Sequence, residues 1–386
     1  MCNKETSIIF TGDIGFDRYM SKKWEDDQLL SKAVLDFCHS ADHLCANVEG
    51  ALINAADNGA KGIFFHSMDP AAISALKKMN SDIWCIANNH TMDAGIDGVI
   101  STQDFAREHG VATVGAGINK DEASRPIYVD GAGGIGIIAV GYMDACVPAT
   151  ETSPGVFRWD DMDAIAERIA EIKSKCRWCI IISHGGEEFA AMPLPYTRER
   201  YLKYLELGAD VVVGHHPHVP ENYELFEDQK AIFYSVGNFI FDTDYQRAHK
   251  YTDVGVLLKL VFSSDRLAFE AIGTVIDREN ERIDVAPLPD IFTNVPGDEY
   301  NILAPLSTKA FIEEEKRRMI FLHPEKYANA PCDVWNSYFM NNEAEEYVAG
   351  IHMDLALIFP ISEQAEKGTW KQSKLEKVKD YLLTMI

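Results

Sequence analysis

The chain repeats one local pattern along most of its length, a short apolar run that stops at a small polar motif. The runs have the length of strands and are rich in β-branched residues, and each motif holds Asp, Glu, Asn or His. The runs cover residues 7–11, 44–46, 83–87, 179–183, 211–213 and 232–236. This repetition constrains the fold more than any single motif, because it places reactive side chains at the ends of many strands.

Segments with helical periodicity separate these runs. Apolar residues recur with helical spacing over residues 27–39, 69–79, 95–109, 160–175 and 196–207. The alternation of strands and helices predicts an α/β fold. In open α/β sheets ligands bind beyond the carboxyl ends of the strands, so we expect the polar motifs to converge in space although they lie far apart in the sequence.

The densest motif follows the run at 211–213. It contains His215, His216, Pro217 and His218, so three of the twelve histidines fall within four positions. Pro217 blocks helix formation, and a rigid turn can then direct His216 and His218 to a common point. The motif therefore predicts metal ligation rather than a polar surface turn.

The strand-end residues form a mixed set of oxygen and nitrogen ligands. Carboxylates, an amide oxygen and imidazoles without thiolates suit zinc, manganese or iron, and they are typical of an open catalytic site. We expect Glu49 to bridge two divalent metal ions, a pair of which could clamp an anionic substrate and activate a water molecule. The predicted metal ligands are Asp13, Glu49, Asn89, His184, His216 and His218.

His90 directly follows the predicted amide ligand and is a candidate general acid or oxyanion-stabilising donor. Asp93, three positions on, could accept the second ring N–H of His90 and fix its tautomer. In the alternative, both residues only cap a helix that begins near Ala94. His215 and Asn238 are expected to line the same site.

The composition is that of a globular protein with an acidic surface. The chain has 386 residues, of which 47% are hydrophobic, and its formal net charge is -24. This charge argues against nonspecific binding to nucleic acid or to an anionic membrane. It does not exclude an anionic substrate, because salt screens distant charges. The sequence shows neither a leader-type apolar segment nor an apolar run of transmembrane length, so we expect a soluble, cytoplasmic protein without a membrane anchor.

Several other patterns carry less weight. Residues 131–136 match G-x-G-x-x-G, but they lie between two strand-like runs and predict a hairpin turn. The eight cysteines are scattered and predict reduced core thiols, and the C-x-x-C at 176–179 lacks a second pair for zinc. Motifs of P-loop kinases, zincins and serine hydrolases are not found in the sequence.

Seven motifs follow one another in a fixed order: TGDIGFDR (11–18), NVEGAL (47–52), ANNHTMDAGIDG (87–98), GVATVGAGIN (110–119), HGGEE (184–188), GADVVVGHHPHV (208–219) and YSVGNFIFD (234–242). This series resembles the CapA family of poly-γ-glutamate capsule biosynthesis proteins, whose fold is similar to that of the calcineurin-like metallophosphoesterases. The resemblance covers about residues 7–245 and implies a four-layer αββα sandwich. It also implies that Asn89 and His90 match the Asn-His pair of that superfamily, and that His216 and His218 match its His-x-His pair.

Three positions depart from the pattern that the resemblance implies. Gly15 stands where phosphoesterases have the histidine of Asp-x-His, which leaves one metal position short of a ligand. Glu49 stands where the bridging carboxylate is usually an aspartate. Gly185 replaces the tryptophan that usually follows the histidine of HWGxE, whereas Glu188 keeps the carboxylate and is a candidate catalytic residue.

The last part of the chain has helical periodicity and lies outside the resemblance. A proline-bearing segment at 285–297 marks a boundary, so we expect a CapA-like domain over residues 1–290 and a helical extension over residues 291–386. Helices are expected at 307–322, 333–359 and 369–385. The extension could cover the mouth of the site, form an oligomer interface or only stabilise the sandwich.

Two classes of function fit these observations. The first is a metal-dependent hydrolase or transferase that acts on a phosphoester or on a γ-glutamyl or other peptide amide, with a metal-dependent peptide epimerase as a related option. The second is a binding or assembly factor for polyglutamate-type polymer synthesis that has kept the fold and lost turnover. The expected partner is in either case a small molecule or a peptide or polyglutamate-type substrate, and not nucleic acid.

Overall fold

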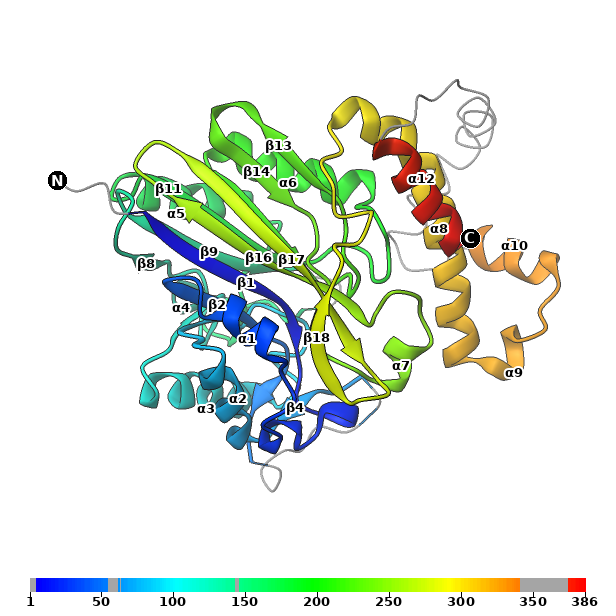
Figure 1. Ribbon diagram of the computed structural model, residues 1–386, viewed down its shortest axis with the longest axis horizontal. Helices are drawn as coiled ribbons and strands as arrows, with labels where there is room; N and C mark the ends of the chain where they lie inside the picture. The colour runs from blue at the N-terminus through cyan, green and yellow to red at the C-terminus, as the bar shows by residue number, and fades with distance from the viewer. Residues whose placement is uncertain (1–4, 55–61, 63, 143–145, 341–373) are drawn as a thin grey trace.

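Two β-sheets pack face to face, and helices cover the outer face of each sheet in the computed structural model (Figure 1). The structure describes residues 5–54, 62, 64–142, 146–340 and 374–386. The predicted four-layer αββα sandwich is therefore confirmed. Within the described residues no helix is both long and apolar enough to cross a membrane.

The first sheet is built around β1, which carries the earliest of the polar motifs at its end. β1 runs parallel to β2 and antiparallel to β16, and β15 pairs with its last residues. Among the described residues the sheet has eight strands. They are β18 (Arg282–Ala286), β17 (Leu267–Asp277), β16 (Val254–Phe262), β1 (Thr6–Ile14), β2 (His43–Val48), β5 (Ile83–Cys85) and β6 (Ala112–Val114), with β15 (Asn238–Ile240) beside β1.

The second sheet has six described strands, and its centre is the parallel set β9, β11, β12 and β14. The hairpin predicted at residues 131–136 is confirmed, because β8 and β9 pair antiparallel on either side of it. In order across the sheet the strands are β13 (Tyr223–Phe226), β14 (Lys230–Phe233), β12 (Val211–His215), β11 (Trp178–His184), β9 (Ile135–Gly141) and β8 (Ile127–Val129).

Strands of the second sheet are apolar on both faces because each face is covered. In β11, Ile180 and Ile182 belong to the core between the sheets, whereas Cys179 and Ile181 pack on the helical side. Successive side chains of a strand point to opposite faces, so a strand buried on both sides reads as an unbroken apolar run. The described cysteines are free thiols, and most are buried as predicted, whereas Cys176 is half-buried and Cys332 is exposed.

The helices lie close to their predicted positions. Those on the first sheet are α1 (Lys32–Cys38), α2 (Ile73–Lys78) and α3 (Gly95–Glu108), and those on the second are α5 (Met162–Lys173) and α6 (Pro195–Leu207). Shorter elements are α4 (Lys120–Ala123), α7 (Asp244–Arg247) and the small pairs β3 (Ala51–Leu52) with β4 (Ser67–Met68) and β7 (Ala116–Gly117) with β10 (Gly155–Val156).

The C-terminal part is helical, and one boundary predicted there was wrong. The helix expected at 307–322 begins ten residues earlier, because Pro305 lies inside the helix and does not end it. Much of the helix expected at 333–359, and residues 369–373 of the last one, lie outside the described residues. The described helices are α8 (Gly297–Leu322), α9 (Pro324–Tyr327), α10 (Cys332–Met340) and α12 (Lys374–Met385).

Helix α8 is attached to the sandwich through both apolar and polar contacts. Phe311 and Met319 pack in one cluster with Leu194, from the segment that follows β11. His249 Nδ1 lies 2.9 Å from Glu314 Oε2, and both side chains are fully buried. Figure 1 shows α8 and α12 side by side, and their apolar residues share a second cluster.

Candidate metal centre

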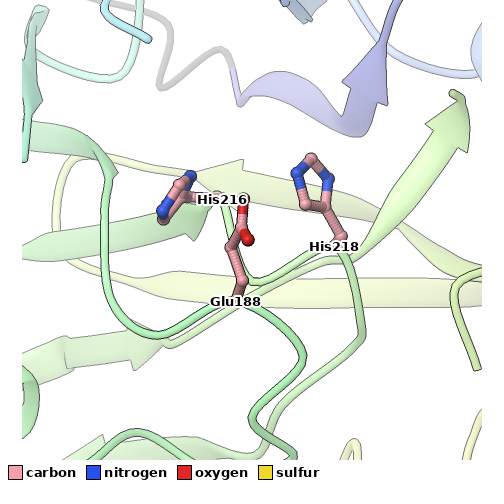
Figure 2. Close-up of side chains that lie close together, drawn as sticks. All are labelled: Glu188, His216 and His218. Carbon is pink, nitrogen blue, oxygen red and sulfur yellow. The ribbon is translucent and has the colours of Figure 1, made fainter. Parts of the chain in front are cut away.

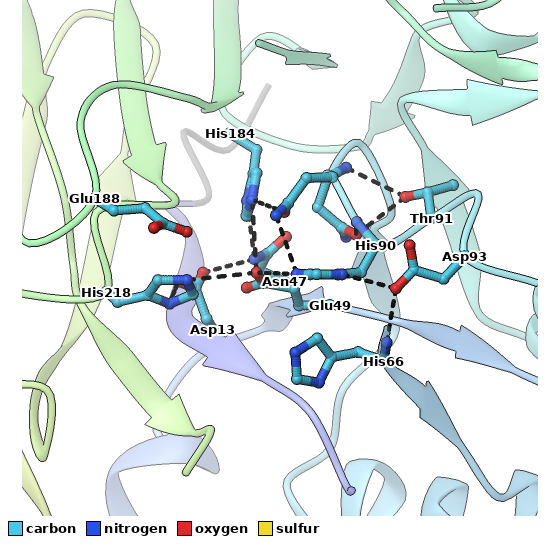
Figure 3. Close-up of polar contacts among 12 residues, drawn as sticks. Asp13, Asn47, Glu49, His66, His90, Thr91, Asp93, His184, Glu188 and His218 are labelled. Atoms are coloured by element: carbon cyan, nitrogen blue, oxygen red, sulfur yellow. Dashed lines mark hydrogen bonds and ion pairs between the residues drawn. The ribbon is translucent and has the colours of Figure 1, made fainter. Parts of the chain in front are cut away.

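The predicted ligands converge at the carboxyl ends of strands from both sheets, and Figure 3 shows Asp13, Glu49, His184 and His218 together. The first sheet supplies a group that ends or follows β1, β2 and β5, and the second supplies a group that ends or follows β11 and β12. The first group consists of Asp13, Glu49 and Asn89, and the second consists of His184, His216 and His218. The convergence that the strand-end motifs predicted is therefore present in the fold.

Glu49 is the centre of this cluster and is fully buried. Neither of its carboxylate oxygens accepts a hydrogen bond from the described residues. Its Oε1 lies 3.7 Å from His184 Nε2, 3.8 Å from His218 Nε2 and 3.9 Å from His90 Nε2. Burial, and then the charge of Asp13, raise the pKa of Glu49 well above its usual range. A buried carboxylate surrounded by imidazoles but without a donor needs a cation to be stable in its charged form.

Asp13 and His218 form the second charged contact of the cluster. Asp13 Oδ2 lies 3.1 Å from His218 Nδ1, and Asn47 Nδ2 donates to Asp13 Oδ1 over 2.7 Å. His218 Nδ1 also lies 2.9 Å from the amide oxygen of Asn238, which orients the ring. Burial alone lowers the pKa of His218, but the charges of Glu49 and Asp13 outweigh burial and raise that pKa to about 10. In the absence of a metal, a proton on His218 therefore neutralises part of the buried negative charge.

His184 and Asn89 connect the two sheets at the same point. The amide oxygen of Asn89 lies 2.9 Å from His184 Nε2, and the other ring nitrogen lies 3.4 Å from Asn47 Nδ2. Burial lowers the pKa of His184 well below its usual range, and the neighbouring histidines lower it further. The imidazole is thus neutral, which is the form that binds a metal ion.

The turn around Pro217 holds two histidines in an uncommon backbone conformation. His216 has φ 97° and His218 has φ 59°, values that residues other than glycine seldom adopt. His216 Nδ1 is buried without a hydrogen-bond partner among the described residues, and burial lowers the pKa of His216 to about 4. Residues held in such conformations are often part of functional sites.

Glu188 completes a second group of ligand atoms with these histidines (Figure 2). The ligand atoms of Glu188, His216 and His218 lie within 4.8 Å of one another, as do those of the group formed by Asp13, Glu49 and His184. Tyr245 donates to Glu188 Oε2 over 2.8 Å. Burial raises the pKa of Glu188, but the two histidines and Tyr245 outweigh it, so the pKa is lowered and the carboxylate is charged.

His90 stands beside the cluster with one ring nitrogen on Asp93. His90 Nδ1 lies 2.8 Å from Asp93 Oδ2, and Asn89 Nδ2 donates to His90 Nε2 over 3.0 Å. Burial, followed by the charge of His66, lowers the pKa of His90 well below its usual range. Burial raises the pKa of Asp93 to about 7. In this state His90 is neutral and its Nε2 accepts hydrogen bonds.

The alternative in which His90 and Asp93 cap a helix does not fit the geometry. The residue before α3 is Ala94, whose methyl side chain cannot make a cap hydrogen bond. Asp93 Oδ2 instead accepts from the backbone N–H of His66 over 2.6 Å. The His90 and Asp93 pair is therefore held by contacts within the site.

A cavity of about 410 Å³ opens above the cluster. Six of the predicted site residues line it, namely Asn89, His90, Asp93, Glu188, His216 and His218. Asp13, Glu49 and His184 are fully buried beneath them. His215 is not among the described residues that line the cavity, because its Nε2 donates to the carbonyl of Thr11 over 2.8 Å and so connects the two sheets. Asn238 is buried, and its amide oxygen contacts His218 Nδ1 over 2.9 Å.

Several residues of the site were not predicted from the sequence, among them Asn47, His66, Tyr245 and Arg318. Asn47 lies two positions before Glu49, and since side chains alternate along a strand, this spacing was a usable signal. His66, Tyr245 and Arg318 line the cavity but belong to segments without a recognisable motif. Their positions depend on tertiary packing.

Neighbouring side chains explain why glycine stands at positions 15 and 185 of the motifs. A Cβ atom at Gly15 would lie 2.7 Å from Phe241 Cδ2, so the ring of Phe241 occupies the space of a larger side chain. A Cβ atom at Gly185 would lie 2.8 Å from Tyr142 Cβ and 2.9 Å from Trp159 Cε3. Nearby aromatic residues thus fill the space at both positions.

Four layers in this order, with acidic, amide and imidazole side chains at the strand ends, define an α/β sandwich with a candidate metal site between its two sheets. The chain belongs to the bacterial capsule synthesis protein family PGA_cap, whose sequence profile matches residues 7–243.

Named relatives agree with this assignment. The chain is 30% identical over 247 residues to the PGA biosynthesis protein CapA of Bacillus subtilis, covering 62% of this chain and 64% of the relative. It is 26% identical over 259 residues to the capsule biosynthesis protein CapA of Bacillus anthracis, covering 64% of this chain and 62% of the relative. The chain thus spans less than two thirds of either relative. A solved phosphatase from Mycoplasma pneumoniae is 15% identical, with a TM-score of 0.45, over 71% of this chain and 94% of that one.

Proposed function

We propose that this chain is a metal-dependent hydrolase or transferase that acts on a phosphoester or on a peptide amide such as a γ-glutamyl bond. The observation that carries the proposal is Glu49, a fully buried carboxylate without a hydrogen-bond donor among the described residues. The nearest ring nitrogens of three histidines lie 3.7 to 3.9 Å from its Oε1. A purely structural role does not explain a buried acid that is left without a donor beneath the residues that line a cavity.

The residues present fit a pair of divalent cations. Asp13 and His184 on one side, and His216 and Glu188 on the other, offer carboxylate oxygens and neutral imidazoles of the kind that zinc, manganese and iron prefer. Glu49 lies within reach of histidines from both groups, which supports its role as the bridging carboxylate. When bound, such ions act as Lewis acids on a phosphoryl or carbonyl oxygen and activate water.

The chain's own contribution to proton transfer is assigned to His90. Its Nε2 accepts a hydrogen bond and lies on the side of Glu49, so it can take up at this atom the proton that the attacking water loses. The proton can later pass to the leaving group, and Asp93 stabilises the imidazolium formed in between. His90 would thus act first as a base and then as an acid.

The test combines metal analysis with an activity screen. Protein purified without chelators is analysed for metals and is then assayed with Mn²⁺, Zn²⁺ or Fe²⁺ on p-nitrophenyl phosphate, bis-p-nitrophenyl phosphate and γ-glutamyl-p-nitroanilide. We expect bound metal near two ions per chain and turnover of at least one substrate class. His216→Ala should lower the metal content with the fold intact. A protein that binds no metal, or an activity that persists in chelator, would refute the proposal.

A second candidate function is a binding or assembly factor for an anionic polymer, in keeping with the names of the two CapA relatives. Gly15 favours it, because Phe241 occupies the space in which a further histidine ligand would stand. Gly15→His should destabilise the protein, whereas the double variant with Phe241→Ala has room for the imidazole. If the double variant gains metal and turnover that the parent lacks, the parent is a binding factor.

A further inference from the structure

A second pair of a histidine and a carboxylate lies at the cavity. His66 lines the cavity, and its Nδ1 lies 2.8 Å from Asp17 Oδ2. Neither residue belongs to the two groups of ligand atoms in the metal centre. Asp17 is the second acid of the motif at residues 11–18, and the metal centre uses only the first, Asp13. The proposed function therefore leaves this pair without a role.

His66 is held in a set position beside the proposed acid-base pair (Figure 3). Its backbone N–H donates to Asp93 Oδ2 over 2.6 Å, and its ring meets that of His90 edge to face with 4.3 Å between ring centroids. The ring of Phe241 packs on it at 5.0 Å between centroids. A Cβ atom at Gly50, which directly follows the predicted bridging ligand, would lie 3.3 Å from the backbone of His66. His66 thus lies next to both the acid-base pair and the metal centre.

The contact with Asp17 determines what the ring of His66 offers to a ligand. A carboxylate oxygen accepts hydrogen bonds, so Nδ1 carries the proton, and the neutral imidazole keeps a lone pair on Nε2. Nε2 has no hydrogen-bond partner among the described residues, and it does not belong to the fully buried polar atoms that lack a partner there. Because His66 lines the cavity, this nitrogen is reached from the cavity.

The neighbouring ring of His90 differs in this respect. Its Nε2 already accepts from Asn89 Nδ2 over 3.0 Å and lies 3.9 Å from Glu49 Oε1, so it belongs to the metal centre. The Nε2 atom of His66 is instead an acceptor that a ligand can use. A ligand that displaces water from this nitrogen without replacing the hydrogen bond loses binding free energy. The cavity therefore favours a ligand that carries a donor.

We propose that His66 Nε2 accepts a hydrogen bond from the substrate, so that the substrate carries an N–H or O–H group near the bond that is broken. The inference rests on the proposed function, in which the metal centre binds the reacting group itself. In a peptide-type substrate the donor is an amide N–H, and in a phosphoester it is a hydroxyl of the esterified alcohol. His66 is then a residue that determines specificity, and the metal centre performs the reaction.

Two pairs of probes, each differing in one donor, test the two sources of the hydrogen bond. γ-Glutamylglycine is compared with γ-glutamylsarcosine, in which a methyl group replaces the amide hydrogen. 2-Hydroxyethyl phosphate is compared with propyl phosphate, in which a methyl group replaces the hydroxyl. The affinities are measured by titration calorimetry on the metal-containing protein, and metal content and turnover are measured on the same samples.

Three variants of the metal-containing protein are compared with the parent. His66→Phe keeps an aromatic ring but removes both nitrogens, and His66→Gln keeps an acceptor oxygen on a chain of similar length. His43→Phe is the matched control, because His43 Nδ1 lies 2.7 Å from Asp82 Oδ2 outside the cavity lining. Any steric effect of a probe's methyl group persists in these variants, so only the hydrogen bond to His66 is lost.

We expect the parent to bind the donor-bearing member of at least one pair about 3-fold to 30-fold more tightly than its methyl analogue. This preference should vanish in His66→Phe, return in part in His66→Gln and persist in His43→Phe. The pair that shows the preference identifies the donor as an amide or a hydroxyl. A parent without preference in either pair, a preference that His66→Phe retains, or an equal loss in His43→Phe would overturn the proposal.

Removal of the imidazole leaves Asp17, whose side chain is 16% exposed, without this partner, so His66→Phe could lose stability. The double variant of His66→Phe with Asp17→Asn removes the unpaired charge and takes the place of the single variant if that variant melts lower than the parent. Missing metal or turnover in the parent counts against the proposed function. A metal-containing, active parent that shows no preference for a donor counts against this inference alone.

Discussion

His218 and Asp13 come from different sheets, yet His218 Nδ1 and Asp13 Oδ2 lie 3.1 Å apart in a place where both side chains are buried. With Glu49 beside them, the site holds two carboxyl groups and needs positive charge. The proton on His218 supplies that charge when no metal is bound, and this exchange between proton and metal has measurable consequences.

Metal binding should release a proton from His218. Its pKa in the folded protein, about 10, is above the ordinary value of 6.5, so protonation stabilises the metal-free protein. This contribution is complete below about pH 6.5 and is lost as the pH rises through about 10. A metal that displaces the proton should bind up to about tenfold tighter per pH unit between about pH 7 and 10. Calorimetry with Zn²⁺ in buffers of different ionisation enthalpy measures the release, and an affinity that is independent of pH would contradict it.

Glu49→Gln should weaken metal binding without destabilising the fold. The amide has nearly the same shape but cannot carry the bridging charge, so we expect metal affinity to fall by at least about 100-fold. The metal-free variant should be no less stable than the metal-free parent, because a buried carboxyl without a donor is removed. Chelator competition and melting curves with and without chelator measure the two effects.

Glu221→Gln is the matched control for this variant. Glu221 is 1% exposed, and burial raises its pKa as it does for Glu49, but it belongs to neither group of ligand atoms. It should keep the metal affinity of the parent. A Glu49→Gln protein that retains its metal would remove Glu49 from the centre.

His90→Ala should lower turnover by about 10²-fold to 10⁴-fold, the usual range for general acid-base catalysis. Metal content and melting temperature should change little. His43→Ala is the control, because His43 Nδ1 makes a similar 2.7 Å contact with Asp82 away from the cavity. Steady-state kinetics on the best substrate of the screen give the comparison. Loss of metal in His90→Ala would identify His90 as a ligand, and normal turnover would exclude it as the acid or base.

His249→Ala should destabilise the protein by about 3 to 5 kcal/mol, because it leaves Glu314 buried without that partner. His249→Ala with Glu314→Gln should recover part of the loss. Urea unfolding followed by circular dichroism gives both free energies of unfolding. An equal loss in the single and double variants would show that the pair contributes by packing on Phe189 and not by charge.

The sequence was most informative where the local pattern determines the structure. The strand-end motifs predicted that Asp13, Glu49 and His184 come together, and they do, because the carboxyl ends of the parallel strands share one edge within each sheet and these edges of the two sheets lie together. The hairpin at 131–136 followed from its glycines and the flanking apolar runs. Local patterns could not show that Pro305 lies within a helix, since tertiary contacts determine whether a helix continues through a proline.

The long-range contacts could not be predicted in the same way. Arg318 belongs to α8 and Tyr245 to α7, and both reach the cavity through tertiary packing that no spacing in the sequence encodes. For His215 the local pattern wrongly predicted a position in the lining of the site. It stands among metal-ligand candidates in the sequence, but strand alternation turns it toward Thr11 between the sheets.

The backbone on either side of Pro217 holds two imidazoles in place at a cost in stability. A residue other than glycine with φ above zero costs on the order of 1 to 3 kcal/mol, and His216 and His218 both adopt such values. Glycine would relieve the cost at either position but has no imidazole. Selection for thermal tolerance alone would therefore favour glycine at both positions, so the two imidazoles point to a requirement of function and not of stability.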